Sequence, residues 1–146
     1  MSLVLDASMA LSWLIQRADP DEQRLSRQAF EATEASGAVA PGLWFTEVGN
    51  TLLVFERARR FTQLDSERFL ADLDCLRIDP DSQPPFPLQR RVLDLGRRYG
   101  LTAYDAVYLE LTERTGLPLA TFDRQLAEAV RRAGGRVFGD GERAGS

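Results

Sequence analysis

Short, mainly apolar runs alternate with longer amphipathic segments along this chain, and this alternation restricts the fold more than any other feature. Runs of two or three residues occur at 3–5, 38–40, 76–78, 119–121 and 137–138. Most are separated by segments with helical periodicity. Strands joined through helices pair in parallel, by right-handed crossovers. We therefore predict an α/β fold, a three-layer α/β/α sandwich with a central parallel sheet.

We expect the chain to form one domain. Its 146 residues, 44% of them hydrophobic, are enough to bury a core without disulfides or a structural metal. The domain is expected to cover residues 1–138, with a flexible tail at 139–146. No apolar run reaches the roughly 18 residues of a membrane span, and the N-terminus lacks the pattern of a secretory signal. We therefore expect a cytoplasmic protein that makes no membrane contact.

Glycine and capping residues indicate where the helices begin and end. Gly37, Gly100 and Gly116 stand where a helix is expected to end, and Thr102 where one begins. The predicted helices cover approximately 9–15, 19–36, 43–60, 65–76, a segment ending at 99, 102–116 and 123–133.

The residue types that are missing restrict the chemistry. The chain has no histidine, and all 18 basic residues are arginine. Without histidine there is no Ser-His or Cys-His pair and no histidine-based zinc site, and without lysine there is no Walker-type phosphate loop. The single cysteine, Cys75, lies among apolar residues, so we expect it to be buried and without a role. An enzyme built from this chain must rely on carboxylates, hydroxyls and arginines, with a hard cation such as Mg²⁺ or Mn²⁺.

Four acids are expected to converge at one edge of the sheet. Asp6 and Asp123 follow short apolar strands, and ligands bind at the carboxyl ends of parallel strands. Asp105 lies in the first turn of a helix whose preceding loop reaches the same edge. Glu47 lies in the second turn of the helix that follows the second strand. These acids form a candidate catalytic and metal-binding site.

Such convergence needs compensation. Two carboxylates about 5 Å apart repel by roughly 3 kcal/mol at an effective dielectric near 20. A divalent cation offsets this repulsion and can activate water for attack on a phosphodiester. Simpler roles exist for each acid alone: Asp6, Asp105 and Asp123 stand at helix N-termini, where acids cap, and Glu47 fits a solvated helix face.

The segments around these acids resemble the four acidic motifs of PIN-domain nucleases, and most closely those of VapC-type toxins of toxin–antitoxin pairs. The resemblance extends from residue 3 to about 138, in the family's order and spacing. The four segments are VLDAS at 4–8, TEVGN at 46–50, TAYDA at 102–106 and LATFD at 119–123.

The resemblance implies a parallel sheet of about five strands and metal-dependent endonucleolytic cleavage of RNA with Mg²⁺ or Mn²⁺. The four acids would be the metal ligands. Polar neighbours that orient ligands, water or phosphate would be Ser8, Asn50 and Thr121, although local capping or solvation explains these three equally well. It also implies a homodimer and a cognate antitoxin whose segment lies in an apolar groove. An amphipathic helix such as the one at 43–60 could supply part of that groove, although burial of its apolar face in the protein's own core is the simpler role.

Other functions remain open at this point. A PIN-like fold used only for binding would leave the cleft catalytically idle, and a housekeeping RNA-processing nuclease would share the same acids. A lysine-assisted phosphatase of the haloacid-dehalogenase type is disfavoured, because the chain has no lysine and has Ser8 where that family has a second aspartate.

The net charge of −4 argues against global electrostatic binding of nucleic acid. Without the four acids of the site, the 22 acidic residues fall to 18 and balance the 18 arginines. Local arginine pairs are therefore the candidates for phosphate contact, although we expect at least half to be solvated surface. The arginine pairs are 59–60, 90–91, 97–98 and 131–132.

Tyr104 precedes the candidate ligand Asp105, and its side chain is expected to pack in the core.

Overall fold

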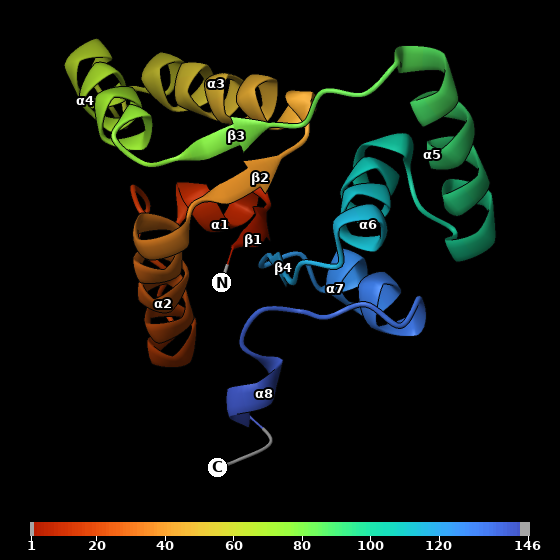
Figure 1. Ribbon diagram of the computed structural model, residues 1–146. Coiled ribbons are helices and arrows are strands. Elements are labelled where there is room, and N and C mark those ends of the chain that lie inside the picture. Colours follow the sequence, from red (N-terminus) through yellow and green to blue (C-terminus); the bar gives the residue numbers. More distant parts are fainter. Residues whose placement is uncertain (1, 144–146) are drawn as a thin grey trace.

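The computed structural model describes residues 2–143 and shows one parallel sheet with helices on both faces. Within these residues the sheet has four strands in the order β3-β2-β1-β4 (Figure 1). Neighbouring strands are all parallel, which confirms the predicted α/β sandwich. The strands are β1 (Leu3–Leu5), β2 (Ala38–Ala40), β3 (Ile78–Pro80) and β4 (Leu119–Ala120).

Helices form the two outer layers. In Figure 1, α5, α6 and α7 group on one side of the sheet and α1 and α2 on the other, with α3 and α4 beside β3. The helices are α1 (Ala7–Leu11), α2 (Pro20–Ser36), α3 (Gly42–Arg57), α4 (Gln63–Asp74), α5 (Pro85–Tyr99), α6 (Ala103–Thr115), α7 (Arg124–Arg132) and α8 (Asp140–Arg143).

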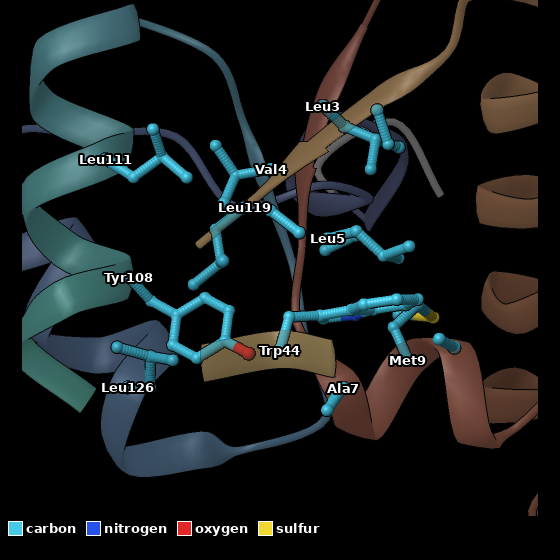
Figure 2. Packing of buried hydrophobic residues seen from close by; sticks show 14 of the residues in the cluster. Leu3, Val4, Leu5, Ala7, Met9, Trp44, Tyr108, Leu111, Leu119 and Leu126 are labelled. Carbon is cyan, nitrogen blue, oxygen red and sulfur yellow. The ribbon is translucent and has the colours of Figure 1, made fainter. Parts of the chain in front are cut away.

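The core is centred on β1, whose three residues are fully buried between the helical layers. A central strand covered on both faces is apolar throughout instead of alternating, which explains the Leu-Val-Leu sequence. Figure 2 shows Leu3, Val4 and Leu5 packed with Leu119 of β4 and with apolar side chains from the helices. No helix among residues 2–143 is both long enough and apolar enough to span a membrane.

Several helix ends lie where the sequence indicates them. Gly100 and Gly116 end α5 and α6 in the left-handed conformation, which glycine adopts without steric cost. Thr102 caps α6 by accepting a hydrogen bond from the N–H of Asp105 at 3.2 Å. These caps place the first turn of α6, and therefore Asp105, directly after the short loop from α5.

Two strand predictions were inaccurate. The third strand begins at Ile78 instead of residue 76, because Leu76 belongs to the turn that follows α4 and Ile78 pairs with Ala38. The expected strand at 137–138 is reduced to an isolated bridge between Val137 and Leu119. The sheet thus has four strands and one bridge within the described residues, close to the five expected.

Two other expectations concern single segments. Cys75 is exposed, contrary to prediction, because it lies at the C-cap of α4, where the buried side chain is that of Leu73. Part of the segment expected to be a flexible tail forms α8, and the Asp140 carboxylate pairs with Arg131 at 2.8 Å. The remainder of that segment, residues 144–146, lies outside the described residues.

A buried carboxylate joins α5 to α6. Glu110 is 3% exposed, and its Oε1 accepts hydrogen bonds from Nε of Arg91 at 3.0 Å and Nε of Arg114 at 2.8 Å. Arg114 also binds the carboxylate of Asp81, just beyond β3, at 2.6 Å. A buried charge is tolerated when it is paired and hydrogen-bonded, so this network stabilises the pair of helices that carries Asp105.

We expect Glu110→Gln to lower the free energy of unfolding by about 1–3 kcal/mol, because two arginines lose their shared ionic partner in a buried place. The melting temperature should fall by roughly 2–4 °C for each kcal/mol of lost stability. The matched control is Glu113→Gln on the exposed face of the same helix, which should leave the melting temperature nearly unchanged. Equal melting of both variants would contradict a stabilising role for the network.

Candidate active site

The adjacent carboxyl ends of β1 and β4 place the first two acids. Asp6 follows β1 directly, and its N–H donates to the carbonyl of Ala120 at 3.0 Å, so it continues the sheet by one residue. Asp123 lies three residues beyond β4 and begins α7. Because β1 and β4 are paired, Asp6 and the segment 121–123 lie together at this edge.

Asp6 is the most buried of the four acids, at 6% exposure. Its Oδ2 accepts hydrogen bonds from the hydroxyls of Ser8 and Thr121, both at 2.6 Å. Although Asp6 occupies the N-cap position of α1, its side chain makes no capping hydrogen bond there. The capping interpretation therefore does not account for Asp6.

Backbone N–H groups determine in which direction the hydroxyls of Ser8 and Thr121 donate their protons. The N–H of Phe122 donates to Ser8 Oγ at 3.0 Å, and the N–H of Asp123 donates to Thr121 Oγ1 at 2.9 Å. Each hydroxyl thus accepts from the chain and donates its own proton to Asp6. This arrangement locks the β4–α7 loop to the start of α1 and holds the Asp6 carboxylate in one orientation.

Glu47 is held by a residue that sequence analysis missed. Its Oε1 accepts a hydrogen bond from the hydroxyl of Tyr108 at 2.6 Å. Tyr108 is 1% exposed, and Figure 2 shows its side chain pointing from α6 into the core cluster. The sequence signal was the spacing: Tyr108 lies three residues after Asp105, hence on the same side of α6, but its apolar setting suggested packing alone.

Asp105 and Asp123 are partly buried at the starts of α6 and α7. Asp123 Oδ1 accepts a hydrogen bond from the N–H of Leu126 at 3.1 Å, so it does cap its helix. Asp105 lies at the third position of α6, where Thr102 provides the cap. Capping and membership of the acidic group are therefore compatible for Asp123.

The pKa shifts indicate that the four acids influence one another electrostatically. Burial is the largest cause that raises the pKa of Asp6, Glu47 and Asp105. The next contribution to the rise is repulsion: Asp123 acts on Asp6, Asp6 and Asp105 act on Glu47, and Asp123 and Asp6 act on Asp105. Every pair except Glu47 with Asp123 is represented. Four segments far apart in sequence thus share one electrostatic environment.

The negative charges of Asp6 and Glu47 also act on Tyr108. Burial first, and then the negative charges of Asp6 and Glu47, raise the pKa of its phenol well above the usual value. The hydroxyl therefore keeps its proton at physiological pH and acts as a donor to Glu47. Hydrogen bonds from Tyr108 to Glu47, and from Ser8 and Thr121 to Asp6, oppose part of the rise in the carboxyl pKa values.

The donor set suits a divalent cation, although the side chains do not surround a common point. All four acids offer carboxylate oxygens, the ligands that Mg²⁺ and Mn²⁺ prefer. Within residues 2–143, no three acidic or cysteine side chains are grouped closely enough to ligate one ion. Shared binding therefore requires that some of these side chains rotate towards one another.

The remaining predicted residues lie in different places. Ser8 and Thr121 contact Asp6, whereas Asn50 is exposed on α3 and its side chain forms no hydrogen bond with the described residues. Tyr104, expected in the core, is 66% exposed beside Asp105, because it occupies the outer face of the first turn of α6.

The arginine pairs mostly interact with the protein itself. Arg91 binds Glu110, Arg98 binds Asp94 and Arg131 binds Asp140. The guanidinium of Arg60 lies over the ring of Phe55, and that of Arg132 over Tyr99. Arg17 and Arg124, which belong to none of these arginine pairs, line a groove together with Thr121 and Asp123, as do Arg24 and Arg131.

Comparison with known proteins identifies relatives over most of the chain. The sequence matches the PIN domain over residues 3–132. It is 30% identical over 133 residues to Ribonuclease VapC3 of Pyrobaculum aerophilum, which covers 88% of this chain and 94% of that protein. Its fold is similar to the crystal structure of PAE2754 from Pyrobaculum aerophilum, with a TM-score of 0.65, 26% identity and coverage of 88% and 87% of the two chains. It also resembles a toxin–antitoxin complex from Klebsiella pneumoniae, with a TM-score of 0.59, 19% identity and coverage of 86% and 89%.

The match to the family extends from the first strand to the end of α7, and it includes all four acids at the sheet edge. We conclude that the chain belongs to the PIN-domain family.

Proposed function

We propose that this protein is a cytoplasmic, metal-dependent endoribonuclease that hydrolyses RNA phosphodiester bonds, and that it is the toxin of a toxin–antitoxin pair. The observation that carries the proposal is the mutual electrostatic interaction of Asp6, Glu47, Asp105 and Asp123, which come from four separate segments. A relative that is 30% identical over most of both chains is named a ribonuclease, which supports the same activity.

The chain's own residues prepare the site before any ion binds. Ser8 and Thr121 fix the buried carboxylate of Asp6, and Tyr108 fixes Glu47. Asp105 and Asp123, like Glu47, are only partly buried and are therefore more accessible than Asp6. The four carboxylates would hold Mg²⁺ or Mn²⁺, which supplies charge neutralisation at the phosphate and activation of water.

The alternative of a catalytically idle binding module is less well supported. Such a module has no need to keep several carboxylates in each other's field, since their repulsion opposes folding. A housekeeping nuclease would use the same four acids, and only a partner distinguishes it from a toxin.

Purified protein is expected to cleave RNA in Mg²⁺ or Mn²⁺ and to lose this activity in chelator. Asp6→Asn, Glu47→Gln and Asp123→Asn should each lower the cleavage rate by at least about 100-fold, because each removes a charged ligand. Asp72→Asn, on the exposed face of α4, is the matched control and should cleave normally. Rates measured on labelled RNA decide the matter, and undiminished cleavage in chelator would contradict the proposal.

Removing one acid should stabilise the metal-free protein. Burial, followed by the charges of Asp123 and Asp6, raises the pKa of Asp105 above its ordinary value of 3.8. A carboxyl with a raised folded-state pKa contributes stability below the unfolded pKa, and this contribution is lost as pH rises through the folded pKa. We therefore expect Asp105→Asn to stabilise the chelated protein at pH 7 by about 1 kcal/mol, after allowance for solvent screening, which is roughly 2–4 °C in melting temperature.

Thermal melts in chelator at pH 4 and pH 7 test this expectation. The Asp105→Asn variant and the wild type should differ less at pH 4, where about half of the unfolded carboxyl is protonated, than at pH 7, where the unfolded carboxyl is fully ionised. Mg²⁺ should stabilise the wild type more than the variant. A variant that melts below the wild type in chelator and still cleaves RNA would show that Asp105 serves only the first turn of α6.

The outer face of α3 supports a protein partner. Leu53 and Val54 are about half exposed, and with Asn50 they have the i, i+3, i+4 spacing of one helical surface. The opposite face of α3 buries Trp44, Val48 and Leu52 in the core, so the exposed residues are not needed for folding. This is the helix that was expected to contribute to a partner groove. An antitoxin segment bound there would cover apolar surface.

We expect co-expression with the neighbouring reading frame to give a stable complex with suppressed RNA cleavage. The double variant Leu53→Ser, Val54→Ser should weaken that complex about tenfold or more while cleavage by the isolated protein is retained. Leu70→Ser, a partly exposed position on α4, is the control. Light scattering of the free protein checks the homodimer that we also propose. A protein that never binds the neighbouring product would leave the nuclease proposal standing but not the toxin assignment.

A further inference from the structure

A groove of about 770 Å³ adjoins the acids on one side. The first half of α2 forms one wall and α7 the other, and the segment 137–140 closes one end. Thr121 and Asp123 belong both to this groove and to the acidic site. A chain-like ligand that crosses the acids can therefore continue into the groove without a break.

The carboxylates that line the groove are already engaged. Glu22 pairs with Arg17 at 2.6 Å, Asp21 pairs with Arg24, and Asp140 pairs with Arg131 at 2.8 Å. Of the two remaining acids outside the site, Asp19 accepts a hydrogen bond from the N–H of Glu22 and Glu128 lies near Arg131. A basic peptide would have to displace these pairs, so the groove is not built to receive a cationic ligand.

The donors with remaining capacity are arginines. Arg124 follows Asp123 directly and is exposed, and its guanidinium forms no hydrogen bond or ion pair with the side chains or backbone of the described residues. Arg17 uses Nε to bind Glu22, while its terminal nitrogens bind none of the described residues. Spare guanidinium donors beside an acidic, metal-binding site are suited to phosphate oxygens.

Arg17 also forms part of a stacking surface. Its guanidinium lies over the ring of Phe122 at 4.4 Å, and its side chain is 40% exposed. Phe122 is fixed by its N–H bond to Ser8, so this pair is attached to the loop that holds Asp6. Unpaired bases of single-stranded RNA stack on aromatic rings and on guanidinium planes.

We propose that this groove binds the RNA strand on one side of the scissile phosphate, with Arg124 on a backbone phosphate and the Arg17–Phe122 pair beneath a base. The inference rests on the proposed function, because it assigns the path of that same substrate. It predicts that RNA must be single-stranded in the groove, since a paired base cannot stack on the guanidinium.

Binding is measured with single-stranded labelled RNA and the Asp105→Asn protein, which leaves the RNA uncut. Arg124→Gln should weaken binding roughly 3- to 10-fold and lower the salt-dependence slope by about 0.7, the value for one phosphate contact to a single strand. Arg17→Lys keeps the positive charge but removes the planar guanidinium group on which a base would stack. It should therefore weaken binding roughly fivefold with little change in the salt-dependence slope. Arg68→Gln on α4 is the control and should bind normally.

Binding of RNA that has been shortened from one end or the other shows whether Arg124 acts through this groove or through another surface. The effect of Arg124→Gln should disappear when nucleotides are removed from one end only. Thermal melts establish that each variant is folded. Unchanged binding by folded Arg124→Gln and Arg17→Lys variants, in a protein whose wild type cleaves RNA, would overturn this inference and leave the proposed function intact. A wild type that neither binds nor cleaves RNA would overturn both.

Discussion

The buried carboxylate of Asp6 is the constraint on which the rest of the site depends. Burying an ionised group costs several kcal/mol unless hydrogen bonds replace its lost hydration. Here two hydroxyls supply them, and both hydroxyls are oriented by backbone N–H groups of the loop that follows β4. The hydrogen bonds that make Asp6 tolerable therefore also hold Phe122 and Asp123 against β1. The pairing of β1 with β4 therefore also positions Asp6 and Asp123 relative to each other.

Hydrogen bonds also orient the carboxylates of Glu47 and Asp123. Burial and mutual repulsion nevertheless raise the pKa of Asp6, Glu47 and Asp105. The protein thus orients the acids without neutralising them, which is what a site reserved for a cation requires. The donors are Ser8 and Thr121 for Asp6, Tyr108 for Glu47 and the N–H of Leu126 for Asp123.

Sequence analysis predicted the parts of this molecule that depend on chain order. Asp6 and Asp123 directly follow apolar runs, so the topology of a parallel sheet was enough to bring them to one edge. Contacts across the fold were not accessible in this way. Tyr108 and Glu110 lie two residues apart on α6 and were both passed over, because one uses its polar end inside the core and the other needs Arg91 from a different helix. The edge strand β3 was misplaced because its pairing, more than its hydrophobicity, defines where it begins.

All basic residues of this chain are arginines, and many of them form ion pairs with carboxylates of the protein. Several arginines that line the groove beside the acids are paired with the protein's own carboxylates, which reduces their attraction for RNA, and the net charge of −4 remains unfavourable for a polyanion. On the proposed function, the cation must therefore do more than assist hydrolysis. Until it offsets the four carboxylates, their field repels the phosphate that has to lie among them. Substrate entry and metal binding are then coupled: each lowers the electrostatic cost of the other, while Arg17 and Arg124 act only at the border of the site, where the repulsion is already weaker.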